Sequence, residues 1–400
     1  MNFGFTDDQR FLGAEVRKFL EASYPLRTVR EIIDSPTFSG SDATLWERIV
    51  SLGWPGLCLA EEQGGAGLDL ETLIVVLEET GRALLPTPLI STMLAAKAIE
   101  RFGSKSQQER WIPGLANGSR IGTVAVLEGE DVLSPAGISA SARRDGDGLV
   151  VSGKKCFVSD GAAADVFVVA VRLDSLDDVC RGDSPRNEPE SARSRASSSA
   201  DSIGWVVVER STPGVLVSPV VGMDRTKPSG TLSLENVRVP LDQALRAGDR
   251  GWAAIEWILD LGAALVTAEA IGSVEAALER TTKFANERIQ FGQRIGRFQG
   301  VKHPLAETYV DLESFRSLAY YAIWALENDE PDARLAVSRA KAYASEAFPQ
   351  AGILGIQLHG GVGYTWEYDI QLYLKRSKWF RPVFGDADYH YERAARLGGL

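Results

Sequence analysis

A glycine-rich turn near the C-terminus is one of two segments whose residue types could bind a phosphorylated ligand. Residues 357–367 read QLHGGVGYTWE and follow a predicted helix. Glycine permits positive φ and close approach of the backbone to a ligand. Free N–H groups in such a turn can hold phosphate oxygens. A helix C-cap followed by a turn would explain the same residues without any ligand.

The second segment is RIQFG at 288–292, followed by RFQG at 297–300. Arg288 stands near the end of a long predicted helix, before an aromatic residue and a glycine. Guanidinium is the best side chain for bidentate phosphate contact, so the segment could clamp a pyrophosphate. A lone arginine there could equally stabilise the C-terminus of the helix dipole.

Composition excludes several other classes of protein. The 43 basic and 54 acidic residues leave a net charge of −11, without the basic excess that a dedicated nucleic-acid binder needs. The 3 cysteines form no CxxC pair and only 3 histidines are present, which argues against a disulfide framework or a metal centre. The N-terminus lacks the pattern of a signal peptide, and no apolar run is long enough to predict an integral membrane segment. These features predict a cytoplasmic protein.

Helical and β-branched patterns divide the chain into three predicted domains. Residues 1–118 show helical spacing of apolar side chains, and residues 241–400 return to long helical patterns. Between them, 119–240 carry seven short β-branched runs that predict a small antiparallel barrel or sandwich. The Ser- and Arg-rich stretch 174–202 has too few large apolar residues to order itself, so we expect a disordered insertion. A regulatory segment is the alternative.

The motifs, taken together, resemble the acyl-CoA dehydrogenase family. They follow the family's order and spacing over nearly all of the chain, with only 174–202 outside. Besides the two segments above, the matching motifs are GWPGL at 53–57, EEQGG at 61–65, EETGR at 78–82, ENVRVP at 235–240 and GW at 251–252.

The resemblance implies a helical N-terminal domain, a central β domain and a C-terminal four-helix bundle. It also implies bound FAD, an acyl-CoA substrate and electron-transfer flavoprotein as the electron acceptor. The assembly would be a homo-oligomer or a heterotetramer with a related subunit. By their matching positions, Arg288, Phe291 and Gln299 would contact the FAD of a neighbouring subunit. Gln357, Gly360 and Gly361 would line the adenine end of that FAD. In the β domain, Phe157 would cover the flavin and Ser159 would donate to it.

Both positions where family members carry the catalytic base lack a carboxylate. An ungapped count places them at Phe384 and Gly262, neither of which accepts a proton. Asp386 is the best-placed substitute base, because a carboxyl held in an apolar pocket has the raised pKa that the reaction needs. Asp386 could instead cap the next helix. Asp260 matches a position near the substrate. The family's hydroxyl on the flavin-binding strand is replaced by Leu127.

Two functional hypotheses follow from these departures. The first is an FAD-dependent acyl-CoA dehydrogenase, which oxidises the α,β-bond of an acyl-CoA thioester with an unusual base. The second is a non-catalytic or cofactor-completing partner subunit of a heteromeric acyl-CoA dehydrogenase. A flavin monooxygenase on the same scaffold is a third possibility that no residue specifically supports.

Overall fold

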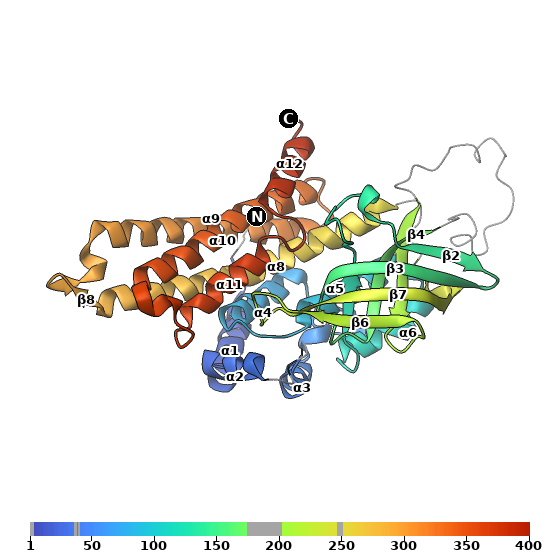
Figure 1. Cartoon of the computed structure of the whole chain (residues 1–400), viewed down its shortest axis with the longest axis horizontal. Coiled ribbons are helices and arrows are strands. Elements are labelled where there is room, and N and C mark those ends of the chain that lie inside the picture. Colours follow the sequence, from blue (N-terminus) through green and yellow to red (C-terminus); the bar gives the residue numbers. More distant parts are fainter. Residues whose placement is uncertain (1–3, 36–37, 39–40, 174–201, 246–250) are drawn as a thin grey trace.

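The structure is a computed structural model that describes residues 4–35, 38, 41–173, 202–245 and 251–400. A helical N-terminal part, a β sheet and a long helical bundle lie side by side (Figure 1). This arrangement confirms the fold class that the sequence predicts. The exact domain boundaries stay a prediction, and so does the disordered insertion, because 174–201 lie outside the described residues.

The N-terminal part is helical from the first turn. Thr6 and Gln9 form the capping box of α1, with Thr6 Oγ1 accepting from the Gln9 N–H at 3.2 Å. The helices of this part are α1 (Asp7–Ser23), α2 (Leu26–Asp34), α3 (Ala43–Ser51), α4 (Leu70–Arg82), α5 (Leu89–Phe102) and α6 (Lys105–Ala116).

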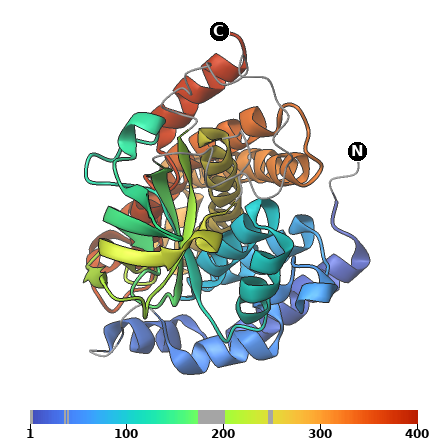
Figure 2. The same ribbon diagram turned by 90° about the vertical axis from the view of Figure 1, so that its right-hand side faces the viewer.

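The β domain is one curled sheet of seven strands, seen from its own side in Figure 2. The strands are β1 (Gly122–Ala125), β2 (Ser141–Asp145), β3 (Gly148–Ser159), β4 (Val166–Leu173), β5 (Ile203–Glu209), β6 (Val215–Val220) and β7 (Ser229–Pro240). The expectation of purely antiparallel pairing is wrong, because β4 pairs in parallel with both β1 and β2. Two predicted runs join into β3, and the charged β2 was not predicted. The side chains of β2 show no strand pattern, and the strand forms because its backbone pairs with β3 in an antiparallel ladder.

The C-terminal part contains the predicted four-helix bundle. It consists of α8 (Trp252–Glu287), α9 (Gln299–Glu327), α10 (Ala333–His359) and α11 (Ile370–Phe380), followed by α12 (Ala387–Leu397). A short hairpin of β8 (Ile289–Gln290) and β9 (Gln293–Arg294) connects α8 to α9 at the far end of the molecule (Figure 1). By length and composition α8 could cross a membrane, but 94% of its most apolar window is buried inside the molecule, as in a core helix.

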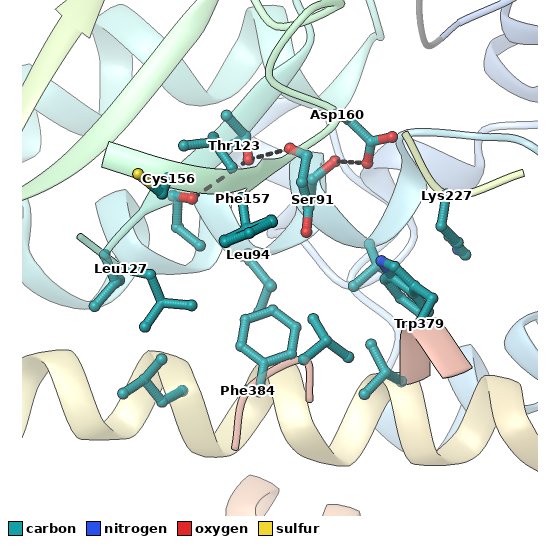
Figure 3. A pocket seen from close by; sticks show the side chains of 18 of the residues that line it. Ser91, Leu94, Thr123, Leu127, Cys156, Phe157, Asp160, Lys227, Trp379 and Phe384 are labelled. Carbon is teal, nitrogen blue, oxygen red and sulfur yellow. Dashed lines mark hydrogen bonds between the residues drawn. The ribbon is translucent and has the colours of Figure 1, made fainter. Parts of the chain in front are cut away.

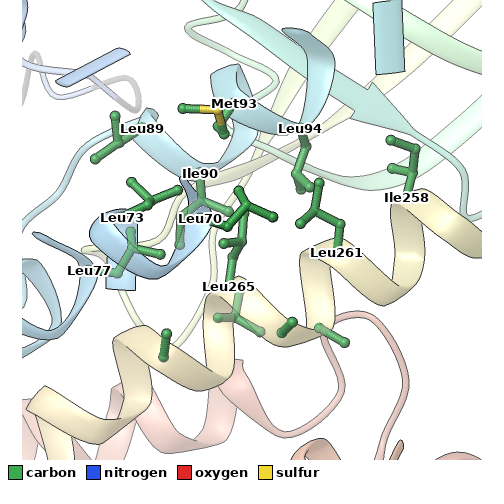
Figure 4. Close-up of a cluster of buried hydrophobic side chains, with 14 of the residues drawn as sticks. Leu70, Leu73, Leu77, Leu89, Ile90, Met93, Leu94, Ile258, Leu261 and Leu265 are labelled. Atoms are coloured by element: carbon green, nitrogen blue, oxygen red, sulfur yellow. The ribbon is translucent and has the colours of Figure 1, made fainter. Parts of the chain in front are cut away.

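Two glycines allow α4 and α8 to pack with their backbones almost in contact. A Cβ atom added to Gly81 would lie 1.8 Å from the Glu269 carbonyl oxygen, and one added to Gly272 would lie 1.7 Å from that of Glu78. Leucine and isoleucine side chains of α4, α5 and α8 interlock beside this crossing (Figure 4). The crossing therefore fixes α8 against the N-terminal part and positions the cavity described below.

We expect Gly272→Ala to destabilise the fold. The added methyl group cannot be accommodated unless α4 and α8 separate, and overpacking of this kind typically costs about 1–3 kcal/mol or more. Gly300→Ala is the matched control, since a Cβ there meets nothing within 4 Å. Urea unfolding would measure both variants, and equal midpoints would contradict the backbone contact.

Candidate functional site

A mostly apolar cavity lies where the sheet meets α5, α8 and the α11–α12 connection. It holds about 730 Å³ of empty space when its open mouth is included. Figure 3 shows Phe157 and Phe384 on opposite walls, with Asp160 and Lys227 toward one end. Most of the lining is apolar. Its polar side chains are Ser91, Thr123, Cys156, Ser159, Asp160 and Lys227.

A β-bulge near the end of β3 presents Phe157 to the cavity. The pairing of β3 with β7 shifts register between Lys155 and Val158, and Phe157 adopts a φ of 51°. Its side chain is 62% exposed, which is unusual for a phenylalanine inside a sheet and leaves an aromatic face available to a ligand. The buried Lys155 ammonium donates to Glu128 and to the Val126 carbonyl, which holds the strand in place.

Two residues beyond the bulge, the hydroxyl of Ser159 is available to a ligand. The Ser159 carbonyl accepts a 2.7 Å hydrogen bond from the Thr123 hydroxyl. Its own hydroxyl has no hydrogen bond to any residue that the structure describes. The structure thus brings Phe157 and Ser159 to the lining of one cavity, and their contacts to a flavin stay a prediction.

The two positions expected to carry a catalytic base meet each other in the structure. A Cβ atom added to Gly262 would lie 2.7 Å from ring atoms of Phe384, so the phenyl ring occupies the space that a side chain on α8 would fill. Phe384 lines the cavity wall. Neither residue can accept a proton. The phenyl ring at 384 fits only because residue 262 has no side chain.

Buried polar groups fix the backbone that carries Phe384. Lys341 Nζ on α10 donates to the carbonyl oxygens of Phe380 and Gly385 at 3.0 Å each and of Arg381 at 3.1 Å. Burial lowers the pKa of this lysine to about 7. His390 Nε2 donates to the Phe384 carbonyl at 2.9 Å, and burial keeps the imidazole neutral by lowering its pKa to about 3.

Asp386 and Asp260 are both engaged away from the cavity lining. Asp386 Oδ1 accepts the Tyr389 N–H at 2.9 Å and caps α12, which is the alternative role that the sequence left open. Asp260 is paired with Arg393 through both carboxylate oxygens, and the second contact measures 2.7 Å. A base at Asp386 and a substrate contact at Asp260 stay predictions, and this geometry does not favour either.

Sequence reasoning missed the buried charge cluster that joins the sheet to the bundle at one end of the cavity. Lys227 donates to Glu269 at 2.7 Å, and Arg376 contacts both Glu269 at 3.3 Å and Asp224 at 2.7 Å. Asp160 lies beside this cluster, and its Oδ2 accepts a 2.6 Å hydrogen bond from Ser91. These residues come from five separate stretches of sequence, and none of them belongs to a local motif that could have revealed the cluster.

The predicted phosphate-binding segments come together at the opposite end of the bundle. Phe284 of α8 stacks on His359 of α10 with ring centroids 4.3 Å apart, which places the two segments beside each other. Arg288, Gln299, Gln357, Gly360 and Gly361 are all exposed there, and Phe291 is 91% exposed at the tip of the hairpin. A Cβ added to Gly360 or Gly361 would meet nothing within 4 Å, so the backbone is open to a ligand.

These exposed segments are far from the cavity of the same chain. Gly262 and Arg288 are 26 positions apart along α8, which is about 39 Å at the helical rise. One dinucleotide cannot lie on Phe157 and contact Arg288 of the same chain. The two groups of residues can serve one cofactor only if they come from different subunits.

Comparison with known proteins agrees with this architecture. Residues 6–119 match the family model for the acyl-CoA dehydrogenase N-terminal domain, and residues 249–398 match the model for the C-terminal domain. The acyl-CoA dehydrogenase IpdE2 of Mycobacterium tuberculosis is 32% identical over 340 residues, covering 84% of this chain and 81% of its own length.

Two similar solved structures extend the comparison to the whole chain. The ChsE4-ChsE5 complex from Mycobacterium tuberculosis gives a TM-score of 0.85 at 26% identity and covers 100% of this chain and 99% of the other. A variant of the Tcur3481-Tcur3483 steroid ACAD gives 0.83 at 30% identity, with 98% of each chain covered.

Fold and site thus define a flavin-dependent oxidoreductase scaffold of three parts. The chain belongs to the acyl-CoA dehydrogenase family. The cofactor of this family is FAD, and the residues present fit it. Phe157 offers an exposed ring, Ser159 a free hydroxyl, and residues 360–361 an open backbone. The replacement of the family's hydroxyl by Leu127 removes one polar contact without closing the cavity.

We expect Asp160→Asn to change how stability depends on pH. Burial raises the pKa of the Asp160 carboxyl from 3.8 to about 6, against the opposing attraction of Lys227 and the hydrogen bond from Ser91. The folded state therefore favours the protonated form, and this contribution is lost as pH rises through about 6. A pKa change of this size corresponds to about 3 kcal/mol.

The variant stays neutral, so its stability relative to wild type should rise between about pH 4 and pH 6 and stay constant at higher pH. Melting temperatures of both proteins across this range would measure the effect. Asp147→Asn, an exposed carboxylate, controls for loss of charge alone. A difference between wild type and Asp160→Asn that does not vary with pH would contradict the raised pKa.

Proposed function

We propose that the chain is a cofactor-completing subunit of a heteromeric, FAD-dependent acyl-CoA dehydrogenase, and that a related partner subunit supplies the catalytic base. The observation that carries this proposal is the contact between Phe384 and Gly262. Both positions that would hold a base are apolar and fill one another's space. The nearest alternatives, Asp386 and Asp260, are engaged in a helix cap and an ion pair.

The far end of the bundle supports the cofactor-completing role. Arg288, Phe291 and Gln299 project from the α8–α9 hairpin region, beside Gln357 and the open backbone at 360–361. Such an exposed set suits the adenine and pyrophosphate of an FAD whose flavin lies in a neighbouring subunit. The names ChsE4-ChsE5 and Tcur3481-Tcur3483 each pair two chains, which is the kind of assembly proposed here.

Self-sufficient dehydrogenation of an acyl-CoA is the second candidate. The observation in its favour is the cavity itself, which remains open and largely apolar. In this case Asp386 would have to leave its cap on α12 to reach the substrate. Bound FAD would accept the hydride in either case, with electron-transfer flavoprotein as the expected acceptor and the cytoplasm as the expected location.

Restoring a carboxylate at the cavity wall tests the proposal directly. We expect the isolated, FAD-loaded wild-type chain not to reduce its flavin with acyl-CoA, and Phe384→Glu to gain this reaction. A general base contributes about 10²–10⁴-fold in rate. Phe384→Gln is the matched control, with similar size but no basicity. Flavin absorbance after anaerobic mixing with butyryl-CoA or octanoyl-CoA gives the rate.

The same assay separates the two candidates. Rapid flavin reduction by the isolated wild-type chain, abolished in Asp386→Asn, would overturn the partner-subunit proposal and identify Asp386 as the base. Reduction that survives in Asp386→Asn would overturn the partner-subunit proposal and exclude Asp386 as the base. No reduction by wild type, together with activity after a related subunit is added, supports the partner role.

Arg288 should be needed for FAD binding by the assembled complex. Loss of a charge-assisted bidentate contact costs about 1.5–3 kcal/mol, so Arg288→Ala should lose most of its flavin at micromolar concentration. Arg294→Ala is the control, because Arg294 is exposed on the same hairpin. Flavin content per purified complex is the measurement. Full retention in Arg288→Ala would remove this residue from the cofactor site.

A further inference from the structure

One end of the cavity holds a buried carboxylate that neither the fold nor the expected reaction explains. Asp160 lines the cavity and is 6% exposed. Its Oδ2 accepts the Ser91 hydroxyl at 2.6 Å, while its backbone N–H donates to the Pro228 carbonyl at 2.9 Å. No described residue donates a hydrogen bond to Oδ1. The space next to this side chain is the cavity itself (Figure 3).

Asp160 is the carboxylate of the buried charge cluster that forms no ion pair with a described residue. Three carboxylates, those of Asp160, Asp224 and Glu269, face two cations, Lys227 and Arg376. Every one of these side chains is buried. Lys227 and Arg376 are committed to Glu269 and Asp224, at distances of 2.7–3.3 Å. The side chain of Asp160 is therefore left with the Ser91 hydroxyl as its hydrogen-bond donor among the described residues, and it is the one carboxylate of the cluster that lines the cavity.

A buried charge without a partner is costly, and it is relieved by a proton or by a hydrogen-bond donor. Burial raises the pKa of Asp160 to about 6, so a proton relieves the charge only in mildly acidic solution. Near neutral pH the remaining source of a donor is a molecule in the cavity. The lining also carries Thr123, Cys156 and Ser159, and its remainder, including Leu94, Leu259 and Trp379, is apolar or aromatic.

We propose that Asp160 is the polar anchor of this cavity and binds an N–H or O–H donor at one end of a ligand whose body is apolar or aromatic. This proposal goes beyond the cofactor-completing role. It assigns a ligand to the cavity of this chain, although that cavity has no catalytic base. Two molecules offer this chemistry. One is the isoalloxazine ring of FAD, with its ring N–H, and the other is an acyl group that carries a hydroxyl or amine.

A purely structural role for Asp160 is the competing explanation. The carboxylate links β3 to α5 through Ser91, and its φ of 54° is one that Asp and Asn tolerate well. Asp160→Asn keeps the size, the backbone tolerance and one oxygen for Ser91. It removes the charge that would strengthen a hydrogen bond to a ligand. A structural role would change only the melting temperature, whereas an anchoring role changes affinity.

The experiment compares wild type, Asp160→Asn and the surface control Asp147→Asn at pH 7.5. Affinity for FAD is measured by flavin fluorescence with each apoprotein. Affinities for butyryl-CoA and 4-hydroxybutyryl-CoA are then measured by titration calorimetry with each FAD-loaded protein. Melting temperatures report folding. If Asp160→Asn fails to fold, Ser91→Ala is used, because it leaves the carboxylate in place but frees its orientation.

We expect Asp160→Asn to weaken binding of one donor-bearing ligand by about tenfold or more, with Asp147→Asn unchanged. A loss confined to FAD identifies the flavin ring as the donor. A loss confined to the hydroxylated acyl-CoA, with butyryl-CoA unaffected, identifies the acyl group. Affinities equal to wild type for all three ligands would overturn the anchor. With Ser91→Ala in its place, a change in the same affinity supports the anchor and unchanged affinities overturn it.

Discussion

The near-contact of the α4 and α8 backbones is the constraint on which the rest of the architecture depends. Gly81 and Gly272 let each helix approach the carbonyl groups of the other, at a separation that no side chain would permit. Because α8 also packs against α5, α9, α10 and α11, its position determines where the bundle lies. The cavity exists where this buried helix passes the edge of the sheet, and its shape follows from that crossing.

The sheet is held to the bundle by electrostatics as well as by apolar packing. Asp224 and Lys227, in the connection between β6 and β7, reach Arg376 of α11 and Glu269 of α8. Breaking a buried pair of this kind is strongly destabilising, so the junction tolerates little movement. A cavity bounded by such a junction is preorganised for its ligand. The same network leaves Asp160 without an ion pair to any described residue.

Local patterns predicted most of the fold but little of the site. Two patterns were sufficient to predict helices: the helical spacing in the first 118 residues and the long apolar pattern of α8. Each pattern reflects burial of a helix face. The strand β2 was missed, since Arg143, Arg144 and Asp145 show no strand pattern and pair only because β3 lies beside them. Of the residues that the family motifs singled out, Phe157 lines the cavity and Arg288 lies at the exposed end of the bundle, while their roles toward FAD stay predictions.

The roles of individual carboxylates could not be predicted, because they depend on partners distant in sequence. Arg393 is 133 positions from Asp260, and Ser91 is 69 positions from Asp160. Sequence counting also could not show that Phe384 and Gly262 touch. The sequence identified each as a position without the family's catalytic carboxylate. The three-dimensional structure adds that the Phe384 ring packs against Gly262, in the space that a side chain at 262 would need.

The clamp that Lys341 forms around the α11–α12 connection has a consequence for how this scaffold changes over evolutionary time. Three of the hydrogen bonds that Lys341 donates end on main-chain carbonyl groups at 380, 381 and 385, and none of them depends on the side chain at 384. The backbone of the connection is therefore held in place whichever side chain stands at position 384. A single substitution at position 384 can therefore remove or restore a catalytic side chain without changing the backbone around it.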